Sequence, residues 1–320
     1  MKAIVTGGAG FIGSHLVDRL LSERYSVTVV DNLSCGFLEN LEHHKGNPRL
    51  TLRNVDIKDT KKLTRIFAGH DAVFHLAAHA NIRESLLDHK ADLENNLVGT
   101  LNILEAMCKN NIPDLVFAST SAIYGEATVL PTSEEYSPLQ TSLYGASKLA
   151  CEAYAEAFTK FAPIKFWAFR FSNVVGERCR RGVVWDFVHK LLKNPSELEI
   201  LGDGKQSKEY LHVKDCVDGI ITGYGKASDK VNIFNLGIDE QTLVDTVADG
   251  VIQEMDLKNV KRTYTGGPSG WIGDIPVVQL SLDKIKKLGW TPRISSEEAI
   301  RRSIKWTIDF SHTHMPSANT

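Results

Sequence analysis

The start of the chain holds the pattern that most constrains the fold. A short apolar run, AIVT at residues 3–6, predicts a buried parallel strand, and glycines follow at positions 7, 10 and 13. Apolar residues at helical spacing in FIGSHLVDRLLSE then predict a helix over 11–23, and YSVTVVD predicts a second strand over 25–31. Strand, glycine turn, helix and strand form one βαβ unit, which is typical of an α/β fold with a parallel sheet between helices.

The same glycine turn predicts a ligand. Gly7, Gly10 and Gly13 allow a sharp turn, let the backbone approach a pyrophosphate and permit close packing of helix on strand. The N-terminus of the helix adds N–H donors and the positive end of a dipole. Asp31 ends the second strand, where its carboxylate can accept hydrogen bonds from ribose hydroxyls and would repel a 2′-phosphate. We therefore expect NAD rather than NADP; a glycine-rich turn without a ligand is the alternative.

A second motif, SLYGASK at 142–148, places Tyr144 four residues before Lys148. On a helix these two side chains share one face. A nearby cation favours the phenolate, so the pair can act as a general base whose pKa is lowered. Taken alone, the same spacing also fits an exposed amphipathic pair.

Composition excludes several other classes of protein. Hydrophobic residues make up 42% of the chain, and 37 basic residues nearly balance 39 acidic ones, so nothing indicates disorder, nucleic acid or a membrane surface as partner. No apolar run approaches transmembrane length. The cysteine count of 5 is odd, and the cysteines are scattered without C-x-x-C or a His cluster at ligand spacing. We expect a reduced, cytoplasmic protein without disulfides and without a metal.

Six motifs occur in a fixed order: TGGAGFIGSH, VVDNLSCG, VFHLAA, NNLVGTLNILEA, FASTSAIYG and SLYGASK. With them the sequence resembles the extended short-chain dehydrogenase/reductase family, and within it the NAD-dependent nucleotide-sugar epimerases, most closely archaeal-type UDP-glucose 4-epimerases. The resemblance runs from residue 1 to about residue 310. It implies a doubly wound, Rossmann-type parallel sheet with a smaller α/β lobe that binds substrate.

The resemblance also implies which residues contact NAD. His75 is expected to be only a strand residue, and either Asn95 or Asn96 is expected to tie the active-site loop together. The implied cofactor residues are Gly7, Gly10, Phe11, Ile12 and Gly13 in the turn, Asp31, Asn32, Gly36, Asp56 and Ile57 around adenosine, Leu76, Ala77, Ala78, Asn95 and Ser119 near the strand ends, and Tyr144 and Lys148.

The catalytic residues implied by the family are Thr120, Tyr144 and Lys148. Thr120 would hydrogen-bond the 4-oxygen of the sugar, Tyr144 would take its proton, and Lys148 would lower the tyrosine pKa while holding the nicotinamide ribose. Family members that dehydrate carry Asp-Glu after the threonine, where this chain has Ser121 and Ala122. Hydride removal and return at C4 needs no further acid or base, so a 4-epimerase is expected.

The implied substrate residues are Arg83, Thr120, Ser121, Asn173, Val183, Lys208 and Asp274. Two departures concern the diphosphate, since relatives have arginine where this chain has Lys208 and Ser269; Arg178, Arg180 or Arg181 could compensate. His79 and Arg83 lie where substrate passes and could favour an anionic sugar.

We expect residues 1–170 to form the NAD-binding domain, with 211–237 returning to it. Residues 171–320, mainly 171–210 and 238–310, would form the lobe. Helices expected over 91–110 and 142–161 have wide apolar faces that could pair in a homodimer or pack in the core. The expected function is interconversion of UDP-glucose and UDP-galactose. The alternatives are another nucleotide sugar, such as a UDP-uronic acid or UDP-N-acetylhexosamine, or a non-catalytic protein that binds NAD and nucleotide sugars.

Overall fold

The computed structural model describes residues 1–314; residues 315–320, the end of the expected lobe, lie outside the described part. A seven-stranded sheet, every neighbouring pair of which is parallel, runs through the larger part of the molecule in the order β11-β6-β5-β4-β1-β2-β3. Its strands are β1 (Lys2–Thr6), β2 (Ser26–Asp31), β3 (Leu50–Asn54), β4 (Ala72–His75), β5 (Asp114–Thr120), β6 (Lys165–Phe171) and β11 (Val231–Leu236). The strand order reverses between β1 and β4, which is the switch point of a doubly wound sheet.

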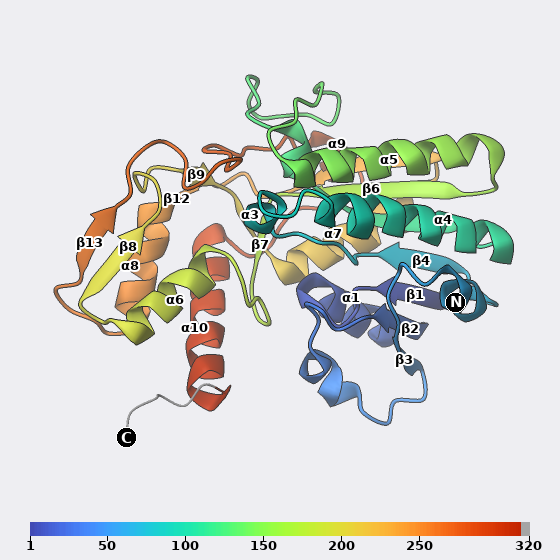
Figure 1. Cartoon of the computed structure of the whole chain (residues 1–320), viewed down its shortest axis with the longest axis horizontal. Helices are drawn as coiled ribbons and strands as arrows, with labels where there is room; N and C mark the ends of the chain where they lie inside the picture. The colour runs from blue at the N-terminus through green and yellow to red at the C-terminus, as the bar shows by residue number, and fades with distance from the viewer. Residues whose placement is uncertain (315–320) are drawn as a thin grey trace.

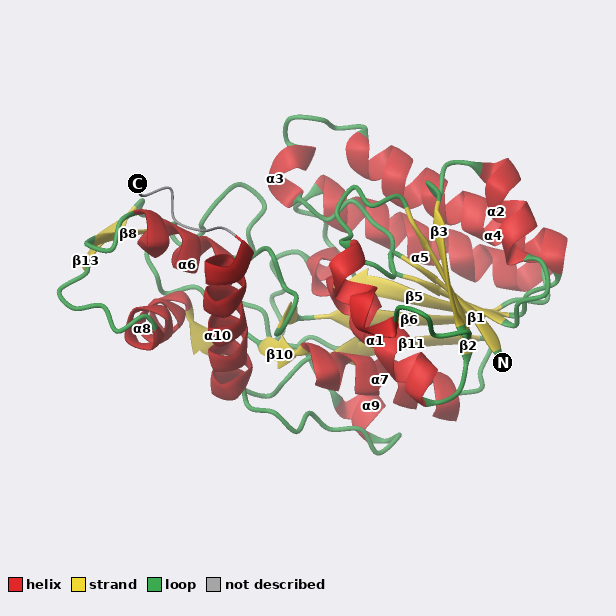
Figure 2. Ribbon diagram, turned by 90° about the horizontal axis from the view of Figure 1, so that it is seen from below, coloured by secondary structure: helices red, strands yellow, loops and turns green. Residues whose placement is uncertain are grey.

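Helices cover both faces of this sheet (Figure 2). One layer contains α2 (Thr60–Phe67), α4 (Gly99–Asn110) and α5 (Leu143–Phe161), and the other contains α1 (Phe11–Ser22), α7 (Val213–Lys226) and α9 (Asp283–Lys286). Each face has its own buried cluster: Ala3 and Val5 pack with Leu16 of α1, whereas Ile4 packs with Ile103 of α4. This alternation along β1 is the period of two expected of a strand buried on both faces. The predicted fold class is confirmed.

A smaller lobe lies at one end of the sheet (Figure 1). Its helices are α6 (Val183–Lys193), α8 (Val244–Glu254) and α10 (Ser296–His314). Three short strand pairs complete it: β7 (Asn173–Val175) with β10 (Tyr210–His212), β8 (Glu197–Ile200) with β13 (Lys261–Tyr264), and β9 (Ser207–Lys208) with β12 (Thr242–Leu243). A third buried cluster, which includes Phe187, Val247 and Ile300, holds the three helices together. Since β6 leads directly into β7, the carboxyl ends of the strands face this lobe.

The chain crosses between the two parts more than once. After the first strands of the lobe, residues 213–236 return to the sheet as α7 and β11. This path supports the proposed return of the chain to the first domain, although β10, which ends at His212, still pairs within the lobe. The expected lobe segment 238–310 also contains an exception, because Val278, Leu280 and Ile285 of α9 and the loop before it pack with the sheet.

One expected helix is interrupted. The pattern over 91–110 predicts a continuous helix, but the structure has a wide π-turn, η2 (Leu93–Val98), before α4 begins. Asn96 lies buried within this turn and bonds to groups outside it. A π-turn inserted in a helix is frequently found at functional sites.

Two observations bear on the class of protein. Across residues 1–314, no helix combines the length and apolarity that a membrane span requires. All 5 cysteines are free.

Candidate active site

The glycine turn between β1 and α1 leaves no room for side chains. Gly7 has a φ of +68°, and a Cβ there would lie 2.7 Å from the backbone nitrogen of Ala77, beyond β4. A Cβ at Gly13 would overlap the carbonyl oxygen of Gly7. These two glycines let α1 begin directly against the ends of β1 and β4, at the switch point of the sheet.

The same turn exposes the start of α1. Gly10 caps the helix, and its first turn, with half-buried Phe11 and Ile12, contains no acidic side chain. The N–H groups of a helix's first turn have no intrahelical partners, and the helix dipole favours an anion there. A Cβ at Gly10 would have only one heavy atom within 4 Å, the Gly7 oxygen. These residues therefore fit the pyrophosphate of a dinucleotide.

Asp31 ends β2 beside this turn, as expected. Its two carboxylate oxygens accept the N–H groups of Ala9 (3.0 Å) and Leu33 (2.8 Å), and each keeps a lone pair. Burial raises the pKa of Asp31, and the two N–H bonds oppose that effect. A Cβ at Gly36 would lie 2.7 Å from either oxygen of this carboxylate. The site thus fits a ribose whose hydroxyls donate to Asp31.

Of the other residues expected near adenosine, two polar side chains bond to each other and one apolar side chain is buried. Asn32 and Asp56 reach each other across the ends of β2 and β3, with Nδ2 of Asn32 donating to Oδ2 of Asp56 at 3.0 Å. Ile57 is buried in the core against Gly99, so only its backbone is available to an adenine.

The segment after β4 forms a wall beside the turn. Leu76, Ala77 and Ala78 are half-buried, and the N–H groups of Leu76 and Ala77 both bond to Thr6, at 3.1 and 3.3 Å. His75 is buried between the hydroxyls of Thr6 (2.7 Å) and Thr100 (3.1 Å), and burial lowers its pKa to about 3. A structural role for His75 accounts for these contacts.

The three expected catalytic residues come from adjacent elements. Thr120 ends β5 and caps the 3₁₀ turn η3 (Ser121–Tyr124), where its Oγ1 accepts the N–H of Ala122 at 3.1 Å. Tyr144 and Lys148 lie one turn apart at the start of α5. At Gly145 a Cβ would lie 2.6 Å from the carbonyl oxygen of Ala122, so α5 begins in direct contact with η3. Thr120 is thereby brought next to Tyr144.

The electrostatics of the pair differ from the expectation. Burial raises the pKa of Tyr144, while the charge of Arg181 and hydrogen bonding to Thr120 oppose the rise. Lys148 is itself buried, with Nζ 3.9 Å from the ring centroid of Phe117, and burial lowers its pKa to about 8. The expected lowering of the Tyr144 pKa by Lys148 is therefore not found, because both groups are desolvated and the opposing charge is that of Arg181.

Behind this pair lies a buried polar network. Ser119 donates its hydroxyl to Glu152, whose carboxylate pairs with Arg170 (Nη2 to Oε2, 2.7 Å). The hydroxyl proton of Ser119 is therefore used by Glu152, and its oxygen can meet a cofactor only as an acceptor. Ser121 is half-buried at the start of η3.

The π-turn resolves the choice between the two asparagines. Asn96 binds the backbone of His79 through both ends of its amide (2.7 and 2.9 Å) and donates to Ser147 of α5 at 2.9 Å. Asn95 bonds only to the carbonyl of Ala91, within its own helix. Asn96, not Asn95, ties the loop to the catalytic helix, and the cofactor contact of Asn95 stays a prediction.

His79 is held by carboxylates. Its Nδ1 lies 2.9 Å from Oδ1 of Asp92 and its Nε2 lies 3.1 Å from Oε2 of Glu84. Burial lowers the pKa of His79, but these two partners raise it more, so the net shift is upward. Both ring nitrogens of His79 are thus occupied by carboxylates of the protein, and a role of His79 toward an anionic sugar stays a prediction.

The expected substrate residues converge on an aromatic ring from the lobe. The guanidinium of Arg83, in the short helix α3 (Ile82–Ser85), lies 4.5 Å from the ring centroid of Trp271, and Nζ of Lys208 lies 5.5 Å from it. Lys208 also pairs with the buried carboxylate of Asp274. The charge of Lys208 is thus largely neutralised, which the sequence did not indicate.

The loop that carries Trp271 reaches the catalytic helix. A Cβ at Gly273 would lie 3.3 Å from the carbonyl oxygen of Thr141 and 3.5 Å from Cβ of Ser142, directly before α5. Asn173 begins β7, and Val183 begins α6, both half-buried on the lobe side.

Two of the three arginines expected near the diphosphate are used elsewhere. Arg178 pairs with Asp18 of α1 (2.9 Å), and Arg180 pairs with Glu39. Both therefore connect the lobe to the first domain instead of compensating for Lys208 and Ser269. Arg181 alone acts on the catalytic site, through its charge on Tyr144.

Sequence reasoning did not select Trp271, Asp92 or the effect of Arg181 on Tyr144. A tryptophan within the glycine-rich stretch GGPSGWIGD was a usable signal, since a large aromatic residue is unusual in such a loop. Nothing in the sequence indicated the other two, because each acts on a partner distant along the chain.

Comparison with known proteins agrees with this geometry. The chain is similar to the UDP-glucose 4-epimerase of Mycolicibacterium smegmatis, with 30% identity over 96% of this chain and 98% of that protein. It is also similar to the crystal structure of the UDP-glucose 4-epimerase of Thermotoga maritima with UDP-glucose (TM-score 0.87, 34% identity, 97% and 99% coverage). A third similar structure is the UDP-N-acetylglucosamine 4-epimerase of Methanobrevibacter ruminantium M1 in complex with UDP-N-acetylmuramic acid (TM-score 0.86, 30% identity, 97% and 98% coverage).

The family match covers residues 3–237, well over half of the chain, and its description names the cofactor that the glycine turn fits. The predicted NAD-dependent enzyme and the predicted family are thereby confirmed. The chain belongs to the NAD dependent epimerase/dehydratase family.

Proposed function

We propose that the chain is a nucleotide-sugar 4-epimerase that interconverts UDP-glucose and UDP-galactose. The proposal rests on the groups that lie at the C-terminal end of β5 and at the N-terminal end of α5. Thr120, Tyr144 and Lys148 meet there, while Ser121 and Ala122 supply no carboxylate beside them. Loss of water requires an additional acid and base, whereas inversion at C4 requires only one group that takes and returns a proton.

Tyr144 is the group that we assign to the proton at O4. Oγ1 of Thr120 already accepts the N–H of Ala122, so its own hydrogen is free to donate to the sugar oxygen or to the phenolate. Burial raises the pKa of Tyr144, and the charge of Arg181 and the hydrogen bond to Thr120 oppose that rise and so stabilise its phenolate form. With a pKa of about 8, Lys148 is mostly protonated at pH 7.

The glycine turn, Asp31 and the wall after β4 are proposed to hold NAD. NAD held there would supply a reversible hydride acceptor for C4, so that no second substrate would be consumed. The role of the protein is to present C4 and O4 together, with Tyr144 on the oxygen, and to allow the sugar to turn between the two transfers.

The substrate diphosphate is proposed to bind near Trp271. Within residues 1–314, Arg83 pairs with no carboxylate, whereas Lys208 pairs with Asp274. Arg83 therefore places a positive charge without a carboxylate partner beside Trp271, where the diphosphate is proposed to bind. The same charge favours a second candidate, a UDP-uronic acid, whose carboxylate it could bind.

A homodimer is proposed from the outer surface of the catalytic helix layer. Leu93 and Val98 of η2 and Leu143, Tyr154 and Phe161 of α5 are large apolar or aromatic residues that are 40–73% exposed. Such a surface indicates a protein partner, and a second copy of the same face would cover it. The free cysteines support the proposed cytoplasmic location.

Proton NMR of the anomeric region tests the activity directly. The protein with added NAD is incubated with UDP-glucose and, separately, with a UDP-glucuronate. We expect a growing UDP-galactose signal, which Tyr144→Phe abolishes and Tyr264→Phe, an exposed tyrosine on β13, leaves unchanged. Conversion of the uronate alone would favour the second candidate, and no conversion of either sugar with NAD bound would contradict the proposal.

A further inference from the structure

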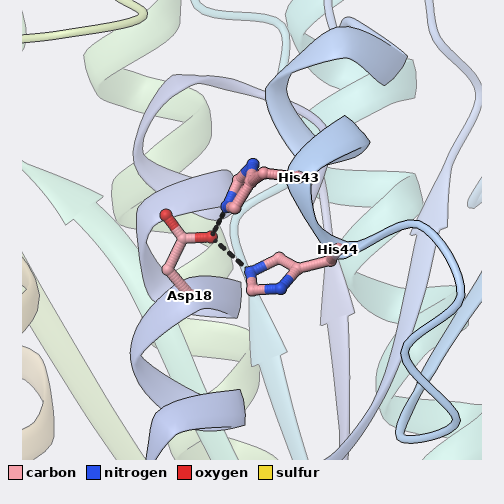
Figure 3. A group of neighbouring side chains, drawn as sticks. All are labelled: Asp18, His43 and His44. Atoms are coloured by element: carbon pink, nitrogen blue, oxygen red, sulfur yellow. Dashed lines mark hydrogen bonds and ion pairs between the residues drawn. The ribbon is translucent and has the colours of Figure 1, made fainter.

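Three side chains from two separate segments meet on the first domain, two turns beyond the start of α1. They are Asp18 of α1 and the last two residues, His43 and His44, of the 3₁₀ helix η1 (Leu38–His44). Nε2 of His43 lies 2.9 Å and Nε2 of His44 lies 2.8 Å from the same oxygen, Oδ1 of Asp18 (Figure 3). None of the three belongs to the candidate active site.

This convergence is unusual for neighbouring residues. With three residues per turn, adjacent side chains of a 3₁₀ helix point about 120° apart. The two imidazole rings nevertheless lie with their centroids 4.1 Å apart, and both point toward α1. One nitrogen from each ring and one carboxylate oxygen are thus gathered within 4.8 Å of one another.

The spacing is close to that of a metal site. Ligand bonds of about 2.0–2.1 Å in a tetrahedral zinc site place ligand atoms about 3.3 Å apart. Small rotations of the three side chains would open the observed 2.8–2.9 Å separations to that value. His43 is 46% exposed, so solvent can supply the remaining ligands.

The carboxylate of Asp18 is also held in place by Arg178, on the side away from the two histidines. Nη1 of Arg178 lies 2.9 Å from Oδ2 of Asp18, the oxygen that the histidines leave free. Ligating carboxylates are commonly fixed by such an outer hydrogen bond. The positive charge of Arg178 also weakens the attraction of a cation, so we expect moderate affinity.

We propose that Asp18, His43 and His44 bind a divalent transition-metal ion, Zn²⁺ or a neighbouring first-row ion, with water completing the coordination. Two imidazoles and a carboxylate suit these ions, and Mg²⁺ prefers oxygen ligands alone. This proposal departs from the expectation of no metal, which considered only ligand spacing along the chain, whereas Asp18 precedes the two histidines by more than twenty residues.

A bound ion would cross-link η1 to α1 through its ligands on the two elements. η1 is already connected to the glycine turn, since the N–H of Phe37 and Nδ2 of Asn40 both donate to the carbonyl oxygen of Ala9 at 2.9 Å. A metal cross-link between η1 and α1 would therefore stabilise the part of the fold that holds NAD.

The test uses the full chain with NAD, titrated with Co²⁺ under visible absorption and with Zn²⁺ under a thermal melt. We expect one equivalent to bind and the melting temperature to rise. His43→Gln and His44→Gln should each weaken binding at least about tenfold. His89→Gln, an exposed histidine outside the cluster, and Cys35→Ser, an exposed thiol, should bind as the wild type does.

Circular dichroism and NAD affinity of each variant establish that it is folded. Three results would overturn the proposal: no binding by the wild type below about 1 mM metal, unchanged affinity in His44→Gln, or loss of binding in Cys35→Ser. Mg²⁺ serves as the ion that should not raise the melting temperature.

Discussion

Replacing Glu152 by glutamine tests the buried network behind the catalytic helix. Glu152 and Arg170 are paired at 2.7 Å with side chains only 5% and 6% exposed, and Ser119 donates to the same carboxylate. Glutamine keeps the shape but removes the negative charge. The amide oxygen of glutamine can still accept one guanidinium N–H, but its NH2 group cannot accept the other, so Arg170 loses the ion pair and one of its two bonds to residue 152. Removing one partner of a buried pair costs about 3–5 kcal/mol of unfolding free energy.

This cost converts to a measurable change in melting temperature. At about 2.1 cal/mol/K per residue, unfolding of the 320-residue chain carries an entropy of about 0.7 kcal/mol/K, so the melting temperature should fall by about 4–8 °C. Differential scanning calorimetry of the wild type and of Glu152→Gln measures this difference in melting temperature. Glu156→Gln, an exposed position one turn along α5, is the matched control and should change stability by at most about 0.5 kcal/mol.

The same variant has a second effect, on Lys148. The charge of Glu152 raises the pKa of Lys148, which burial lowers to about 8. Without that charge the pKa falls further, so Lys148 loses its proton at lower pH and the alkaline limb of the activity profile should move to lower pH. A loss of stability below about 1 kcal/mol in Glu152→Gln would refute the reasoning.

Three further predictions concern the site and its surroundings. Thr120→Val removes a hydrogen bond that lowers the pKa of Tyr144, so the acidic limb of the activity profile should move to higher pH; an unmoved limb would contradict this. Gly13→Ala places a Cβ in the backbone of the turn and should abolish the rise in melting temperature on adding NAD, whereas Gly225→Ala, where a Cβ meets nothing within 4 Å, should not. The folded pKa of His79 is raised, so its stabilising effect is full below pH about 6.5 and is lost as pH rises through the folded pKa. In urea titrations the deficit of His79→Gln should therefore be larger at pH 6 than at pH 9; a constant deficit would contradict this.

The parts of the molecule that the sequence predicts well are those set by local pattern. The βαβ unit and the helix of Tyr144 follow from periodicity and glycine spacing, which depend on neighbouring residues. The cofactor follows from the same turn, because Gly7, Gly10 and Gly13 act within one loop.

The parts that the sequence does not predict are set by contacts between distant segments. From the sequence alone Lys208 is expected to be an unpaired cation. In the fold it pairs with Asp274, which lies 66 residues further along the chain. The π-turn at 93–98 depends on Asn96 bonding to His79 and Ser147, and no periodicity describes that. The gathering of His43 and His44 on Asp18 likewise exists only after α1 and η1 have packed together.

The measurement that tests the central claim most directly follows a label at C4. UDP-galactose carrying deuterium at C4 is incubated with the protein and NAD, and the product is examined by NMR and mass spectrometry. If Thr120 and Tyr144 serve inversion by removal and return of hydride, UDP-glucose should form with the deuterium retained at C4, and more slowly than from unlabelled substrate. Loss of the deuterium to solvent, or the absence of UDP-glucose with NAD bound, would contradict the account.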